Sequence, residues 1–531
     1  MVVKAFTWKD VWEPMLASKV GYHWEPDKAR RRAIILIVLI AVLIQLSASL
    51  IVIERLPVDG PIVDGEHYIQ QARLLHCCAS LKESVQYGLY PAFLNPLVRL
   101  FKFRDPPDWR TASKYSTIVL IYATQAVVLA AATAFLLLTV LRTWGTSFAA
   151  RSGAALALTA FLAGPLVVVW PASIMNETLT ISALFLVLAG CMHADLQPKP
   201  LRGLVIAYIA SIPPMFVRDS LAAMTIVFVF LTASSAVVVP SSKAARLLVV
   251  PVVGIMALVL AVRVVSVAGM DRTVENLANL VQLRMLPDDA RRHFFVEHGL
   301  PLSPIVMARS GAPAFVDNKL FERDDELREF PGMISYRNWL RSEGAKTYFE
   351  FLVSHPGYLL RSIWHTPNMP RSDYIDKAAD LKFSIIDLFS QPSLIYGGTL
   401  APLPRWLADF LAAPFGWYIT LMYLFGALTN YSLSLIRKRP ASYVDAAAIS
   451  AAAGLFIAFH SEAWDPWRHT VPFILVIDIA LIIRASDAAA WLLARWKQSS
   501  RASGLDRAPP QRQDAAGTKE KTSRDHQTAR V

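Results

Sequence analysis

The chain is a series of long apolar blocks separated by shorter polar segments. The first block covers residues 33–53 and directly follows the basic cluster Lys28 to Arg32. Because roughly 20 apolar residues cross the hydrocarbon core as an α-helix, the pattern predicts an all-α polytopic membrane protein with about ten transmembrane helices. The other predicted spans cover residues 115–141, 152–169, 178–192, 203–217, 220–240, 247–267, 407–435, 443–459 and 470–485.

The composition agrees with this pattern. Hydrophobic residues make up 54% of the 531 residues and charged residues only 18%, whereas soluble proteins contain about a quarter charged residues. A cytosolic globular enzyme is therefore excluded. The net charge of +12 would suggest nucleic acid in a soluble protein, but no basic patch with interleaved aromatic residues is present. We expect no nucleic-acid partner.

The positions of the lysine and arginine residues predict how the chain is oriented in the membrane. With the N-terminus inside, every short cytoplasmic turn is basic, as the positive-inside rule requires. We expect an integral multi-pass protein with both termini in the cytoplasm, and the Arg- and Ala-rich spans favour a bacterial inner (plasma) membrane. The basic residues of these turns include Arg142, Arg151, Lys199, Arg202, Lys243, Arg246, Arg437, Lys438 and Arg439.

This topology divides the chain into five segments. The expected order is a cytoplasmic N-terminal segment, a transmembrane catalytic module, a large outer (periplasmic) loop with helical spacing, C-terminal transmembrane helices and a disordered cytoplasmic tail. Their boundaries are 1–32, 33–267 with a first outer loop at 54–114, 268–406, 407–485 and 486–531.

Ionisable residues gather at the outer ends of the predicted spans. Such residues are costly at a membrane unless they pair or line a wet cavity, so the gathering predicts a functional site. Each also has a structural interpretation: a solvated loop acid, a helix cap, a turn pair or an interfacial anchor. The residues are Asp64 and Glu66 after the first span, Glu177 at the fourth, Arg218 and Asp219 between the fifth and sixth, and Arg468 and His469 at the last.

The order of these features resembles the GT-C superfamily of membrane glycosyltransferases, which includes protein O-mannosyltransferases and lipid A aminoarabinose transferases. The resemblance covers residues 33–485. It rests on Asp64 four residues before Tyr68, the stretch Tyr87-Gly88-Leu89-Tyr90-Pro91, the outer-end Glu177, the long loop after the seventh span, and Arg468-His469 followed by Pro472. The family often has Glu directly after the Asp; here Gly65 takes that place and the acid is Glu66.

The resemblance implies a reaction and a set of roles. It implies inverting transfer of a hexosyl or pentosyl group from a polyprenyl-phosphate donor to an envelope glycan, lipid or protein acceptor on the outer face. Asp64 would be the base, with Glu66 and Glu177 as supporting acids. Tyr68 would bind the substrate. The cations Arg218, Arg468 and His469, together with Asp219, would bind the donor.

The sequence makes no cofactor certain. Some relatives hold a divalent metal near the acids, but this chain shows no clear metal-ligand spacing, so metal use stays open. The chain has no Walker A sequence, no dinucleotide-binding glycine pattern, no HExxH and no nucleophile elbow. An ATP-driven pump is therefore disfavoured.

Three other functions fit parts of the pattern. A transporter or flippase of lipid-linked glycans is suggested by Pro213-Pro214, which interrupts a span. An O-antigen polymerase or ligase would suit the long loop at 268–406. A structural scaffold of an envelope complex would use the basic tail for binding. The outer-end position of the polar residues favours the glycosyltransferase.

Overall fold

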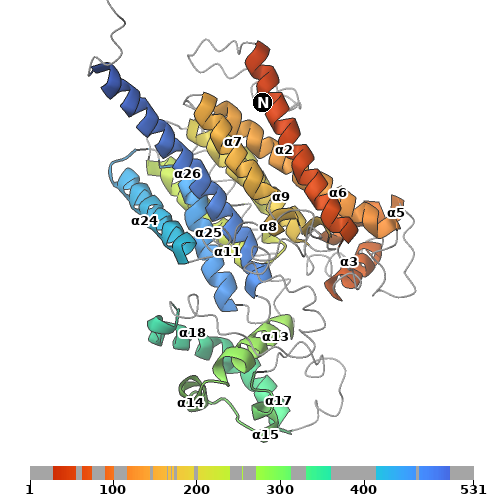
Figure 1. Ribbon diagram of the computed structural model, residues 1–531. Helices are drawn as coiled ribbons and strands as arrows, with labels where there is room; N and C mark the ends of the chain where they lie inside the picture. The colour runs from red at the N-terminus through yellow and green to blue at the C-terminus, as the bar shows by residue number, and fades with distance from the viewer. Residues whose placement is uncertain are drawn as a thin grey trace, which may run out of the picture.

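The structure is a computed structural model in which every described element is helical (Figure 1). No strand occurs within the described ranges. These ranges are 28–55, 63–74, 90–100, 116–143, 148–163, 165–168, 170–172, 176–196, 201–238, 254, 257, 271–311, 331–359, 414–439, 441–461 and 466–502.

Long apolar helices form the larger part of the molecule. Each predicted span coincides with one of them except 247–267, where only residues 254 and 257 are described. The helices are α2 (Lys28–Arg55), α6 (Ser116–Thr143), α7 (Phe148–Leu162), α9 (Glu177–Leu196), α10 (Leu201–Met215), α11 (Asp219–Val238), α24 (Pro414–Ile436), α25 (Tyr443–Ser461) and α26 (Pro466–Ala502).

Four segments of the described chain are long and apolar enough to cross a membrane: Lys28–Ile51, Ile118–Arg142, Glu177–Asp195 and Ile419–Ile436. Other apolar helices, such as Tyr443–Ala458, are shorter. An all-α membrane protein is therefore confirmed, whereas the expected number of ten spans is not.

Two predicted boundaries were wrong. The expected span 152–169 is interrupted, because α7 ends at Leu162 and is followed by the short helices α8 (Pro165–Val168) and η3 (Trp170–Ala172). A proline lacks a backbone N–H and disfavours helical geometry in the residue before it, which accounts for the interruption before Pro165. The tail expected to be disordered from 486 is helical through 486–502, since α26 continues to Ala502 over strong helix formers such as alanine.

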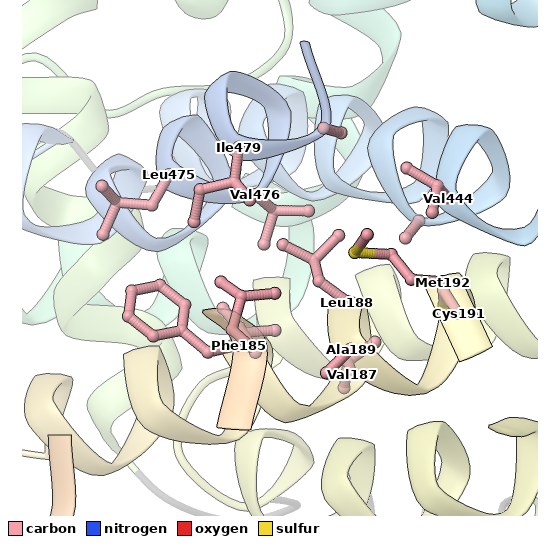
Figure 2. Packing of buried hydrophobic residues seen from close by; sticks show 14 of the residues in the cluster. Phe185, Val187, Leu188, Ala189, Cys191, Met192, Val444, Leu475, Val476 and Ile479 are labelled. Carbon is pink, nitrogen blue, oxygen red and sulfur yellow. The ribbon is translucent and has the colours of Figure 1, made fainter. Parts of the chain in front are cut away.

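Helix α9 is the centre of the helical bundle. It packs against α6, α10, α25 and α26 (Figure 1). Figure 2 shows Phe185 and Leu188 of α9 beside Leu475, Val476 and Ile479 of α26, all of them buried. This apolar packing holds the ends of the helices in fixed positions.

The crossing of α9 and α10 depends on two glycines. A Cβ atom on Gly190 would lie 2.7 Å from the backbone nitrogen of Ala207, and one on Gly203 would lie 2.4 Å from that of Ala194. Small residues let the backbones of membrane helices approach closely. The glycines therefore bring α9 and α10 into direct backbone contact.

Between the first two long helices lie the short helices α3 (Val63–Leu74) and α5 (Tyr90–Leu100). They pack against each other and share a small core with α6 that includes Ile69, Leu94 and Ile121. The amide nitrogen of Asn95 donates a hydrogen bond of 2.5 Å to the carbonyl of Ala72. The first outer loop predicted at 54–114 is thus helical in its described parts.

A separate cluster of short helices forms below the bundle in Figure 1, and we call it the small helical domain. Its buried core includes Phe295, Tyr336, Trp339 and Phe351. The predicted loop 268–406 is accordingly helical where it is described. The elements are α13 (Asp271–Leu280), the π-helix Val281–Met285, α14 (Asp289–Glu297), α15 (Pro304–Met307), α17 (Pro331–Trp339), the π-helix Leu340–Gly344 and α18 (Ala345–Ser354).

The small helical domain is attached to the last turn of α25. The Tyr348 hydroxyl donates a hydrogen bond of 2.8 Å to the carbonyl of His460. The His460 ring lies between Tyr358 and Phe456, with ring centroids 6.2 and 4.6 Å apart. Burial and the charge of Arg284 lower the pKa of His460 from 6.5 to about 4, so the ring is neutral at physiological pH.

Two ends of the bundle are used below. We call the end with Glu177 and Arg218 the Glu177 end, and the opposite end, with Asp195 and Arg484, the Arg484 end. Since Asp195 contacts the first residues of α25, α25 begins at the Arg484 end. Its last turn and the small helical domain therefore lie at the Glu177 end.

Candidate functional site at the Glu177 end

Arg218 is placed by a tight turn between α10 and α11. Pro213 and Pro214 are among the last residues of α10, and their carbonyls accept hydrogen bonds from the backbone N–H groups of Phe216 and Val217 at 3.1 and 3.0 Å. The helix ends within this turn, and Arg218 follows at once. The turn holds the arginine in the space beside the first residue of α9.

Glu177 is that first residue, and its side chain forms an ion pair with Arg218. The bond joins Oε1 of Glu177 to Nη2 of Arg218, and the side chains are 2% and 11% exposed. Two opposite charges held away from water stabilise each other strongly. The N-terminus of α9 adds to the stabilisation of the carboxylate.

The residue before Glu177 connects this ion pair to helix α3. The side-chain nitrogen of Asn176 donates a hydrogen bond of 3.1 Å to the Tyr68 hydroxyl. Both residues are buried. The bond brings Tyr68, which was predicted from its spacing to Asp64, to the same place as Glu177 and Arg218.

A second set of contacts extends from Tyr68 to α5 and α6. Tyr68 meets Tyr90 edge to face, with ring centroids 5.0 Å apart. The Tyr90 hydroxyl donates to Oε1 of Gln125 at 2.8 Å, and Nε2 of Gln125 donates to the carbonyl of Pro171 at 3.1 Å. Burial raises the pKa of Tyr90, and Tyr68, Tyr122 and Glu177 add to the shift. Tyr90 is therefore a neutral hydrogen-bond donor here.

We call Tyr68, Tyr90, Gln125, Asn176, Glu177 and Arg218 the Glu177 network. It contains three of the residues predicted from the sequence: Tyr68, Glu177 and Arg218. It joins the first outer loop to the starts of α9 and α11. Since these segments are far apart in the sequence, their meeting is a property of the fold.

The other predicted residues have defined positions on the backbone. Asp64 and Glu66 lie in the first turn of α3, with position 64 one helical turn before Tyr68. Asp219 begins α11, and Arg468 lies in the first turn of α26. The side chains of these four residues lie outside the described part of the structure. His469 is buried in the same turn of α26, and the Glu177 network as defined does not include it.

Three members of the network were not among the predicted site residues: Asn176, Tyr90 and Gln125. Tyr90 belongs to the aromatic-proline stretch of the first outer loop, and Asn176 directly precedes Glu177. Gln125 is a polar residue inside the apolar block 115–141 and is fully buried. A buried polar group must find a hydrogen-bond partner, so Gln125 was the available signal for a polar contact at this end.

The Glu177 network combines one carboxylate, one guanidinium and two phenol groups with two amide side chains that hydrogen-bond to the phenols. No group of three or more histidine, cysteine, aspartate or glutamate side chains that could hold a metal ion is present among the described residues. An arginine at a helix junction is suited to phosphate, and a carboxylate to hydroxyl groups.

Comparison with known proteins gave no relatives: no family model, no curated protein and no solved structure matches this chain. The function is therefore inferred from the chain's own residues.

Proposed function

We propose that the chain is an inverting glycosyltransferase of the GT-C type, which moves a sugar from a polyprenyl-phosphate donor to an acceptor hydroxyl at the outer face of a membrane. The observation that carries the proposal is the Glu177 network. It joins an acid, an arginine and the helix that bears Asp64 at one end of an apolar bundle.

The reaction assigns a task to each group. The acceptor oxygen attacks the anomeric carbon of the sugar while the bond from that carbon to the phosphate oxygen breaks. Asp64 takes the hydroxyl proton, a contribution of about 10²- to 10⁴-fold. The phosphate leaves as an anion, so it needs cations rather than an acid, and Arg218, Arg468 and His469 supply them.

Glu177 has a positioning role in this proposal. Its carboxylate fixes the Arg218 guanidinium, and Asn176 beside it fixes Tyr68 on α3. A preorganised cation costs less to align with the leaving phosphate than a mobile one. The carboxylate also favours positive charge on the sugar in the transition state.

A transporter of lipid-linked glycans is the alternative from a different class. It was suggested by Pro213 and Pro214 as a possible break in the middle of a span. In the structure both prolines lie at the end of α10, where they form the turn before Arg218. They shape the end of a helix and do not divide one, which favours chemistry at the membrane surface.

The test is a mass profile of envelope glycans and glycolipids from cells that lack the chain. The cells are complemented with the wild type, with Asp64→Asn, or with Glu54→Gln at equal membrane levels. Glu54 is an exposed acid at the end of α2 and serves as the matched control.

We expect the wild type and Glu54→Gln to restore a missing sugar mass and Asp64→Asn to leave it missing. The mass difference then identifies the sugar class. Restoration by all three would mean that Asp64 has no catalytic role, and the transporter and the O-antigen polymerase or ligase would become the better explanations.

A further inference from the structure

Helix α26 contains an aspartate deep within the predicted span 470–485. At a rise of about 1.5 Å per residue, Asp478 lies about 13 Å from His469 and about 9 Å from Arg484 along the helix axis. These two residues lie near the Glu177 end and at the Arg484 end of the same helix. Asp478 is therefore near the middle of the predicted span 470–485.

Arg484, a half-buried charge of the same helix, has its partners within the chain. Arg484 forms ion pairs with Asp445 at 2.9 Å, Asp487 at 3.2 Å and Asp195 at 3.6 Å. In contrast, no hydrogen bond or ion pair involves Asp478 in the structure as described. A carboxyl group in hydrocarbon is expensive without a partner.

Asp478 also lies off the face that builds the core. Leu475, Val476 and Ile479 point toward α9 in Figure 2 and are no more than 1% exposed. Asp478 belongs instead to a stripe of half-buried and exposed positions with Ile474, Leu481 and Ala485. Residues at this spacing share one helix face, and the chain covers this face only in part.

We propose that this stripe is a contact surface for a transmembrane helix of another protein that carries a lysine or arginine near the middle of the bilayer. Charge complementarity selects this occupant, because a cation at matching depth is the group that satisfies an isolated carboxylate in lipid. The inference is independent of the proposed glycosyltransferase.

The test uses the full chain in liposomes with a synthetic leucine-rich transmembrane peptide that has one central lysine. An identical peptide with leucine at that place is the reference. Energy transfer between a dye on the peptide and one on the chain reports association. We expect the lysine peptide to bind the wild type at least tenfold more tightly than the leucine peptide, and Asp478→Asn to abolish the difference.

Two controls separate this result from its alternatives. Ile474→Asn places an amide one turn away on the same stripe and keeps Asp478, so the preference for lysine should persist. Asp478→Asn should not lower the thermal midpoint of the isolated chain. A lowered midpoint would place the partner of Asp478 within this chain. If labelled chains associate with one another and Asp478→Asn removes that association, the occupant is a second copy of this chain. Either result, or equal binding of both peptides to the wild type, would overturn the proposal.

Discussion

Single residues decide the chemistry of the Glu177 end. Glu177 and Arg218 are nearly inaccessible to water, at 2% and 11% exposure, so each charge depends on the other. Breaking a buried pair leaves an uncompensated charge, whereas replacing both charges by apolar groups removes the desolvation cost as well. Replacing only one of the two residues should therefore destabilise the chain more than replacing both.

Glu177→Gln should therefore lower the free energy of unfolding by about 3 to 5 kcal/mol. Titration of the detergent-solubilised chain with a denaturing detergent measures this loss. The double variant Glu177→Leu with Arg218→Met should lose clearly less. Equal losses in the single and double variants would show that the pair is not buried as described.

His460 makes the attachment of the small helical domain sensitive to acid. Its pKa is lowered from 6.5 to about 4 by burial and by the charge of Arg284, so unfolding takes up a proton below pH 6.5. Stability should fall between pH 6.5 and 4 by about 2 to 3 kcal/mol from this group. Above pH 6.5 it should contribute no pH dependence.

Thermal midpoints of the wild type and His460→Gln, measured from pH 7 to pH 4, isolate this contribution. Carboxylates titrate in both chains, so the difference between the two curves is the relevant quantity. The wild type should lose more stability on acidification than the variant. Parallel curves would mean that the pKa of His460 is not lowered by folding.

Whole helices depend on contacts at their ends and crossings. The Asp195 carboxylate at the end of α9 caps α25 from outside: it accepts from the backbone N–H groups of Tyr443 at 2.6 Å and Val444 at 3.3 Å, and from the Ser442 hydroxyl at 2.8 Å. Helix starts leave such N–H groups without partners inside the helix. One side chain thus connects the centre of the bundle to α25.

Asp195→Ala should destabilise the chain by about 2 kcal/mol or more, since it removes a cap and a partner of Arg484. Asp487 also pairs with Arg484, but within one helix and at 33% exposure. Asp487→Ala should cost less than about 1 kcal/mol. Denaturant titration compares the two, and a similar cost for both would contradict the capping role.

The crossing of α9 and α10 predicts a contrast between two glycines. Gly190→Ala should be destabilising by about 1 to 3 kcal/mol, because the new Cβ meets backbone atoms that cannot move aside. Gly153 of α7 has nothing within 4 Å of its Cβ position, so Gly153→Ala should be neutral or slightly stabilising. Thermal midpoints of the two variants test this, and a tolerated Gly190→Ala would mean a looser crossing.

At the scale of the whole molecule, the apolar blocks predicted where most of the long helices lie, although only four described segments are long and apolar enough to cross a membrane. The hydropathy pattern did not predict the break at Pro165, because an average over many residues does not register a single proline. It also did not predict that residues 486–502 are helical. For the site, Glu177 and Arg218 were found because ionisable residues at the outer ends of spans are costly unless they pair. Asn176 and Gln125 were missed because an uncharged amide does not identify its partner, and their partners Tyr68 and Tyr90 are distant in sequence.

The most direct test of the proposed reaction uses the purified full chain in liposomes. It is supplied with a panel of polyprenyl-phosphate sugars and with membranes from cells that lack the chain as the source of acceptor. Mass spectrometry follows the donor lipid. We predict that one donor is converted to polyprenyl phosphate in step with sugar appearing on an acceptor, and that Asp64→Asn slows this at least about 100-fold. Conversion of no donor by a chain that restores the envelope profile in cells, or equal conversion by Asp64→Asn, would contradict the assignment.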